Sequence, residues 1–355
     1  MTRITFIADG YCVRAQKMHE VLQGIGYEIP VITSQPQPVP WGPPQIYYNT
    51  IAQLRAAIRN HAKTTDIWHV HNEPNYAATL IREMYPKAKI ILDMHDSNYW
   101  RIPKTYELWG KELIHWPEED MGVLSADAFV VPSDECGIEL HERTAKQTIV
   151  VWSAAPGREY QPMTTATRAG LVMFGGHSAP GKFIGEKQDG YNQLDSWRDY
   201  TAIYTAFSKH RHVSAFCQYF KPGTMDPLTN YYSNLSITCG VMPRPELLAH
   251  LGEFTWNLVG NMKSEKDDNT VWKYALPNKF HDAIAGGVPS LIWGKETPAG
   301  RIAEKYKIGI AVDSIEEALD RWSEHREKRF NLHMKRSKFT MEKQIDPLIK
   351  LYDSL

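Results

Sequence analysis

One segment carries the strongest information about the fold: residues 272–289 read WKYALPNKFHDAIAGGVP. Proline is tolerated in the first turn of a helix, and glycine just past a helix end accepts left-handed dihedral angles. Pro277 and the two glycines at 286–287 therefore bound a helix of about two turns. Val288 to Trp293 then reads as a buried strand. A short helix that leads directly into an apolar strand is typical of an α/β protein.

The predicted helix offers a site for an anion. Its N-terminal amides lack partners within the helix and can bind a negatively charged group. Lys279 and Asp282, three positions apart, lie on one side, whereas Phe280 and Ile284, four apart, face the core. This arrangement suits a ligand with phosphate and hydroxyl groups, such as a nucleotide-sugar. An ordinary surface ion pair between Lys279 and Asp282 is the alternative, and the sequence leaves both open.

The rest of the chain shows short apolar, β-branched runs between helix-like segments, which predicts parallel sheets with crossover helices. The expected strands of the first half are Ile4–Ala8, Ile29–Thr33, Ile67–Val70, Lys89–Met94, Ala128–Val131 and Ile149–Trp152. The expected helices between them are Val13–Gly24, Ile51–Ala62, Tyr76–Met84 and Glu135–Arg143. The pattern restarts with strands at Leu171–Phe174, Val213–Cys217, Leu235–Thr238, Thr255–Val259, Val288–Ile292 and Gly309–Val312. Small residues with Pro and Gly at 153–157 (SAAPG) place a domain boundary near residue 155.

Composition narrows the function classes. The 355 residues are 43% hydrophobic and 23% charged, which is normal for a soluble globular protein. A formal net charge of −1 argues against nonspecific nucleic-acid binding through a broad basic surface. The basic run between Arg321 and Lys338 is interpreted as a solvated helix face rather than a binding patch.

The four cysteines lie far apart, with no pair at metal-binding spacing: Cys12, Cys136, Cys217 and Cys239. We interpret them as free, buried thiols of a reducing compartment. The N-terminal apolar run is too short for a signal peptide, and no run reaches the length of a transmembrane helix. The sequence therefore predicts a cytoplasmic protein.

Five segments in order resemble GT-B glycosyltransferases, in the large, mostly retaining group of bacterial nucleotide-sugar-dependent sugar transferases. Residues 272–289 resemble the donor-binding motif of that family. The others are residues 66–74 (DIWHVHNEP), 90–96 (IILDMHD), 125–133 (SADAFVVPS) and 339–344 (FTMEKQ). The resemblance implies an α/β fold of two Rossmann-like domains facing across a cleft. Residues 1–155 would form the acceptor-side domain and 156–330 the nucleotide-sugar-binding domain, and 331–355 would return to the first domain.

The resemblance also implies which residues bind the donor. Two glutamates that the family often places eight positions apart correspond here to Tyr274 and Asp282, so the first carboxylate is replaced by a phenol. Asp282 can still accept hydrogen bonds from ribose hydroxyls. Lys279 and Lys182 would stabilise the leaving diphosphate without a metal. The remaining donor-binding candidates are Gly175, Gly176, Val241, Met242, Arg244, Pro277 and Asn278.

On the acceptor side, His95 follows a buried strand, and the resemblance implies that it contacts the transferred sugar. A strand-end histidine bonded to a neighbouring loop is the equally weighted alternative. The other acceptor-side candidates are Asp9, Gly10, Tyr11, His71 and Glu73. His69 and His71 share one strand face and could form a metal site with Asp93 or Asp96. No third ligand stands at convincing spacing, so we expect neither a metal nor a cofactor beyond the co-substrate.

The function expected from the resemblance is a hexosyltransferase that moves a sugar from a nucleotide-diphosphate sugar to an acceptor hydroxyl, with retention. The acceptor could be a glycan precursor, a lipid-linked sugar or a small molecule. A modified DNA base is a rarer acceptor, which the near-neutral charge disfavours. The alternatives are a nucleotide-sugar 2-epimerase, which needs carboxylates around the sugar, and a noncatalytic nucleotide-sugar-binding protein.

Overall fold

The computed structural model describes residues 2–8, 12–34, 45–71, 75–101, 107–108, 111–112, 117–175, 200–217, 233, 237–262 and 270–355. The chain divides into two compact units. The first unit combines Met1–Arg101, Leu113–Pro156 and Met341–Leu355, and the second combines Ile102–Glu112 and Gly157–Thr340. Residues 331–340 thus group with the second unit, and the chain returns to the first at Met341.

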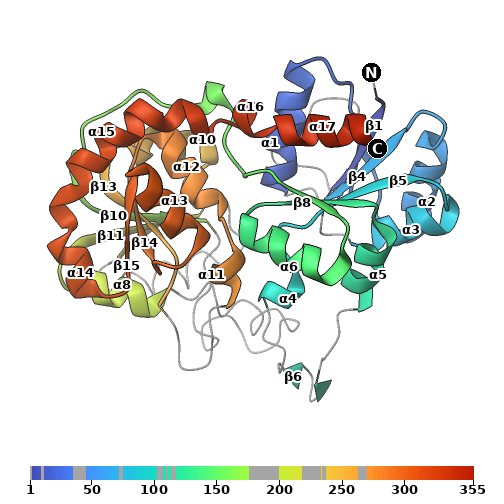
Figure 1. Cartoon of the computed structure of the whole chain (residues 1–355). Coiled ribbons are helices and arrows are strands. Elements are labelled where there is room, and N and C mark those ends of the chain that lie inside the picture. Colours follow the sequence, from blue (N-terminus) through green and yellow to red (C-terminus); the bar gives the residue numbers. More distant parts are fainter. Residues whose placement is uncertain are drawn as a thin grey trace. The chain divides into compact units, whose positions relative to one another are not determined.

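The first unit is built on a seven-stranded parallel sheet in the order β3-β2-β1-β4-β5-β8-β9. Figure 1 labels β1, β4, β5 and β8 of this sheet. Its strands are β1 (Ile4–Ala8), β2 (Val31–Thr33), β3 (Gln45–Tyr47), β4 (Ile67–His71), β5 (Lys89–Asp93), β8 (Ala128–Val131) and β9 (Gln147–Val150). Its helices are α1 (Val13–Gly24), α2 (Ile51–His61), α3 (Tyr76–Met84), α4 (Asn98–Arg101), α5 (Pro117–Ser125), α6 (Asp134–Thr144), α16 (Met341–Gln344) and α17 (Asp346–Ser354).

The two ends of the chain share one hydrophobic core in this unit. Residues of β1 and α1 pack with Met341, Leu348 and Leu351, which belong to α16 and α17 (Figure 1). A proline within this segment favours a break over one continuous helix, and the structure has one: α16 ends at Gln344 and Pro347 lies in the first turn of α17. Burial of the C-terminal helices therefore completes the sheet face that α1 covers.

The second unit has a six-stranded parallel sheet in the order β12-β11-β10-β13-β14-β15. Its strands are β10 (Arg168–Phe174), β11 (His212–Cys217), β12 (Ile237–Val241), β13 (Phe254–Val259), β14 (Ser290–Trp293) and β15 (Gly309–Val312). Its helices are α8 (Thr201–Ser208), α10 (Arg244–Leu251), α11 (Thr270–Tyr274), α12 (Asn278–Gly286), α13 (Pro298–Tyr306), α14 (Ile315–Asp320) and α15 (His325–Lys335). A small antiparallel pair joins β6 (Glu107–Leu108) and β7 (Lys111–Glu112).

The predicted α/β class with two Rossmann-like parallel sheets is confirmed. Each strand expected from the sequence has a counterpart, with boundaries shifted by a few residues. The sequence missed β3, which begins at the end of a proline-rich stretch. Within the described ranges, no helix is long and apolar enough to cross a membrane.

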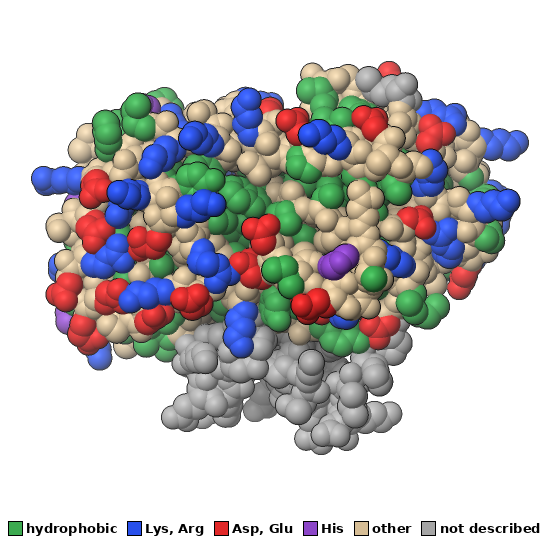
Figure 2. All heavy atoms as spheres, in the orientation of Figure 1, with side chains coloured by type: hydrophobic (Ala, Val, Ile, Leu, Met, Phe, Trp, Pro, Cys, Tyr) green, Lys and Arg blue, Asp and Glu red, His purple; other side chains and the backbone are tan. Residues whose placement is uncertain are grey.

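The basic run near the end of the second unit differs from the prediction. Arg329 of α15 is buried and donates to the backbone carbonyls of Gly252, Phe254 and Gly287. Lys328 is buried too, whereas Arg326 and Lys338 are exposed, so the interpretation of a solvated helix face is wrong for the two buried residues. The charged side chains in Figure 2 are mixed by sign over the face shown. The basic residues of α15 thus include structural ones that bind carbonyl groups.

Candidate functional site

Helix α12 begins without a side-chain cap. Pro277 precedes it in an extended conformation (φ −72°, ψ 148°) and makes no side-chain cap hydrogen bond to the first turn. Phe280 and Ile284 are 1% and 2% exposed, which confirms that this side faces the core. Gly287 ends the helix at a φ of 75°, as the Gly-Gly pair predicted. An uncapped helix N-terminus carries partial positive charge and suits an anionic ligand.

Lys279 lies over the carboxyl end of the central strand β10. Its Nζ donates to the hydroxyl of Tyr200 at 3.0 Å and lies 4.6 Å from the centroid of that ring. A Cβ built on Gly175, the residue that follows β10, would lie 4.0 Å from the same Nζ. The structure therefore brings together two predicted donor residues, Gly175 and Lys279, at one edge of the sheet.

Asp282 is paired with Arg244 at the start of α10. The carboxylate of Asp282 is 2% exposed, and its Oδ1 accepts from Arg244 Nη2 at 2.9 Å. Arg244 also donates to both carboxylate oxygens of Glu159, at 2.5 and 2.6 Å. Burial works against the charged guanidinium, but Asp282 and Glu159 raise the pKa of Arg244 above its usual value. Asp282 is thus a buried partner of a cation, rather than half of an exposed ion pair.

A residue that the sequence did not indicate supports the start of α12. Asn257 is fully buried in β13, and its Nδ2 donates to the Lys279 carbonyl at 3.5 Å and to Ser290 Oγ at 3.2 Å. An amide side chain within a mostly apolar strand was the available signal. It ties the first turn of α12 to strands β13 and β14.

Other donor candidates lie at the ends of neighbouring elements. Val241 is the last residue of β12, Met242 follows it, and Tyr274 ends α11. Gly176 and Lys182 lie outside the described residues. The roles of all these residues in donor binding stay predictions.

In the first unit, His95 follows β5 and lies in a chain of polar contacts. Its Nδ1 is 3.0 Å from Oδ1 of Asp93, and its Nε2 is 3.5 Å from Sγ of Cys12. Asp93 is fully buried and accepts from Arg14 Nε at 2.9 Å through each carboxylate oxygen. Burial opposes ionisation of Asp93, but Arg14 and His95 hold the pKa of that carboxyl well below its usual range. Burial also disfavours the His95 imidazolium, yet Cys12 and Asp93 raise its pKa well above the usual value.

His69 and His71 share one face of β4, as predicted: their rings stack with centroids 4.4 Å apart. Both side chains are fully buried, and His69 Nδ1 lies 2.7 Å from the hydroxyl of Tyr352. Burial lowers the pKa of His69 to about 4 and that of His71 well below the usual value. Both rings are therefore neutral at neutral pH.

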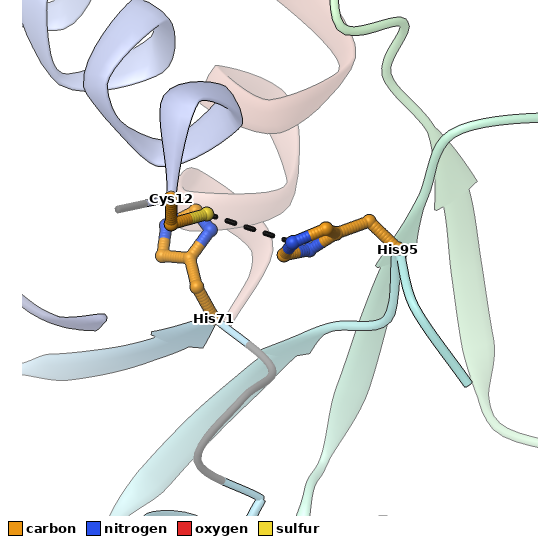
Figure 3. Close-up of side chains that lie close together, drawn as sticks. All are labelled: Cys12, His71 and His95. Carbon is orange, nitrogen blue, oxygen red and sulfur yellow. Dashed lines mark hydrogen bonds between the residues drawn. The ribbon is translucent and has the colours of Figure 1, made fainter. Parts of the chain in front are cut away.

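The cysteines differ in part from the prediction. Cys136 is buried, whereas Cys12 is only partly buried and accepts from the amide of Ala15 at the start of α1. Figure 3 shows Cys12, His71 and His95 around one point of the first unit. The remaining acceptor-side candidates, Asp9, Gly10, Tyr11 and Glu73, lie outside the described residues.

Two doubly wound units of this kind define the GT-B fold. The chain is similar to the solved structure of sucrose-phosphate synthase from Thermosynechococcus elongatus, with a TM-score of 0.66 and 13% identity over 100% of this chain and 99% of that one. AviGT4, a glycosyltransferase involved in avilamycin A biosynthesis, gives a TM-score of 0.56 and 13% identity, covering 99% and 97% of the two chains.

A UDP-N-acetylglucosamine 2-epimerase is also similar, with a TM-score of 0.51 and 12% identity over 100% of this chain and 98% of that one. Neither a family model nor a curated protein sequence matches the chain. At such identities the likeness establishes the fold. The predicted resemblance to GT-B glycosyltransferases is confirmed at that level.

Proposed function

We propose that this chain transfers a sugar from a nucleotide-diphosphate sugar to an acceptor hydroxyl, with retention of configuration. The observation that carries the proposal is the position of Lys279. Its ammonium group, the uncapped start of α12 and Gly175 lie together at the carboxyl edge of the second sheet. Open α/β sheets bind their ligands at that edge, and these groups match a diphosphate.

In this function, the protein stabilises charge on the leaving nucleoside diphosphate. Negative charge grows on the phosphate oxygens as the glycosidic bond breaks. The ammonium of Lys279 and the first amides of α12 are fixed donors for it, so the donor chemistry needs no metal. Tyr200 holds the ammonium through a hydrogen bond, and Asn257 holds the backbone beneath it. Asp282, which Arg244 holds in place, would accept from the ribose hydroxyls.

The acceptor would bind at the first unit, with His95 in contact with the transferred sugar. Its ring is fixed by Asp93, which is itself held by Arg14. A fixed imidazole can donate to a sugar hydroxyl without rearrangement during the reaction. The acceptor classes are those with exposed hydroxyls: a glycan precursor, a lipid-linked sugar or a small molecule.

The first test is donor binding. The melting temperature is measured with UDP-, GDP-, ADP-, CMP- and dTDP-sugars and with the free nucleotides, because a ligand that binds only the folded state stabilises it. We expect one nucleotide class to stabilise the protein, which also identifies the base. An absence of any shift at millimolar concentrations would contradict the proposal.

The second test removes the cation. A charged hydrogen bond contributes about 1.5–3 kcal/mol, so Lys279→Ala should weaken binding of the selected nucleotide-sugar by about 10–100-fold. Lys273→Ala is the matched control, because Lys273 is an exposed lysine of the neighbouring α11. Equal affinities of the two variants, measured by calorimetry, would show that Lys279 does not contact the diphosphate.

Epimerisation is the second candidate, because an epimerase shares the fold along the whole chain. Incubation with the selected nucleotide-sugar in the absence of an acceptor separates the two functions. An epimerase converts the sugar while it stays attached to the nucleotide, whereas a transferase releases nucleoside diphosphate by transfer or slow hydrolysis. Binding with neither product would identify a noncatalytic nucleotide-sugar-binding protein.

A further inference from the structure

We propose that the first unit binds a divalent transition metal, such as Zn²⁺, through Cys12, His71 and His95. One donor atom from each of these residues lies within 4.8 Å of the others. Thiolate and imidazole are the ligands that zinc prefers in proteins. This site uses His95 Nε2, the atom that would otherwise donate to the sugar, so a bound metal replaces that contact. The donor chemistry proposed for Lys279 does not involve these residues.

Sheet order explains why these residues meet. Strands β1, β4 and β5 are neighbours in the first sheet. Cys12 starts the helix that follows β1, His71 ends β4 and His95 stands two residues after β5. The carboxyl ends of neighbouring parallel strands meet at one edge, and Figure 3 shows the three side chains turned toward one another there.

The distance between two of the donor atoms fits a metal site. Cys12 Sγ and His95 Nε2 are 3.5 Å apart. Zinc–sulfur and zinc–nitrogen bonds of about 2.3 and 2.0 Å, at a tetrahedral angle, place the two donor atoms about 3.5 Å apart. A metal ion could therefore join these two ligands with little movement of the backbone.

Surrounding groups orient His95 as a ligand. Its Nδ1 bonds Asp93, and both oxygens of that carboxylate accept from Arg14. Metal-binding histidines commonly bond a carboxylate through the nitrogen that does not bind the metal, which fixes the tautomer and the ring orientation. Nε2 is thereby directed at Cys12.

His71 provides the independent observation that points to a ligand. Its side chain is fully buried, and neither ring nitrogen has a hydrogen-bond partner within the part of the chain that is described. Its Nδ1 is 3.7 Å from Asp93 Oδ2, which is beyond hydrogen-bond length. A buried imidazole without partners is costly, and a metal bond would satisfy it.

Two rival interpretations fit less well. Cys12, His95 and Asp93 resemble an activated cysteine nucleophile, but that arrangement gives His71 no role. His69, His71 and Asp93 are a second group with donor atoms in range. There, both oxygens of Asp93 already accept from Arg14, and all three side chains are fully buried, which leaves an ion no direct access from solvent.

The proposed site has three protein ligands and is reachable from solvent. Cys12 is partly exposed, and the His95 side chain is 14% exposed. Three protein ligands leave one tetrahedral position for water or an oxygen ligand, which is the pattern of metal sites that bind small molecules. The site would therefore take up metal from solution and hold one exchangeable ligand.

The test uses the full chain, stripped of metal and titrated with Co²⁺, because zinc itself has no visible spectrum. We expect one equivalent of Co²⁺ to give tetrahedral d–d bands and a thiolate-to-cobalt charge-transfer band. Cys12→Ser should abolish the charge-transfer band. Cys136→Ser, which changes the other described free cysteine, should keep it.

The variant His71→Phe tests whether His71 binds the metal or is only a structural residue of the core. Because the nitrogens of His71 have no described partners, the metal-free variant should stay folded. Zn²⁺ should raise the melting temperature of the wild type and of Cys136→Ser, and it should leave His71→Phe and Cys12→Ser unshifted. The proposal is overturned if no charge-transfer band appears, if the band persists in Cys12→Ser, or if His71→Phe binds Co²⁺ as tightly as the wild type. None of these readouts needs a nucleotide or an acceptor, so they are distinct from the test of sugar transfer.

Discussion

Replacing Arg244 with methionine should strongly destabilise the second unit. Arg244 is 16% exposed and bridges two carboxylates: Glu159, which is 19% exposed, and Asp282, which is 2% exposed. Arg244→Met keeps most of the side-chain volume and removes the charge. The buried carboxylate of Asp282 then loses the cation that it faces.

The size of the stability loss depends on which carboxylate remains buried without its cation. Breaking a buried ion pair by removing one side costs about 3–5 kcal/mol, because the remaining charge stays desolvated. Water can reach part of Glu159, so Glu159 should account for little of the lost stability. Most of the loss should come from the buried carboxylate of Asp282. We expect a loss of about 3 kcal/mol. Adding Asp282→Asn removes the stranded charge, so the double variant should recover more than half of that loss.

The assay is urea unfolding followed by circular dichroism at neutral pH, with the double-mutant cycle completed by Asp282→Asn alone. Glu159→Gln is the matched control, since it leaves Arg244 paired with Asp282 and should cost less than about 1 kcal/mol. An Arg244→Met loss no larger than that of the control would refute the reasoning. So would a double variant that is less stable than Arg244→Met.

Two further predictions concern buried basic groups. Burial lowers the pKa of Arg329 to about 10, and Arg329→Met should cost about 2–4 kcal/mol because it strands buried carbonyls. The exposed Arg326→Met is its control in urea unfolding, and equal losses would contradict the prediction. His19 is buried and its Nε2 donates to the carbonyl of Ile29, and burial lowers its pKa. The contribution of His19 to the free energy of unfolding should therefore be fully present above pH ~6.5. It should fall as the pH drops below that value, by up to about 1.4 kcal/mol per pH unit. In His19→Gln, the free energy of unfolding should depend less on pH below ~6.5 than in the wild type. An unchanged pH dependence would contradict this prediction.

The sequence indicated the fold well because the fold depends on local patterns. Apolar runs of strand length, separated by amphipathic segments, correspond to both parallel sheets. Pro277 and Gly287 fixed the ends of α12 through their backbone preferences, and Pro347 did so for α17. Strand β3 was missed because it has only three residues next to a proline-rich stretch.

The sequence indicated the candidate site less well because its contacts join distant residues. Gly175 follows the end of β10 and Lys279 lies in the first turn of the later helix α12, and family resemblance was needed to pair them. The partner of Asp282 was expected to be Lys279 or a ribose, and the structure instead places Arg244 against it. No local pattern distinguishes Lys279 from Arg244 as the partner, because each is a cation that a loop could bring within reach.

The Cys12 group shows where such long-range prediction can improve. Spacing along the chain suggested no metal site, because ligand spacing is informative only when one loop or helix supplies several ligands. In a doubly wound sheet, residues that are far apart in the chain meet when their strands are neighbours, so the order of the strands is the relevant information. Once β1, β4 and β5 are placed side by side, Cys12, His71 and His95 become neighbours despite the chain length between them. A search for ligand-type residues within a few positions of the carboxyl ends of adjacent strands would have found this group from the sequence and the fold class alone.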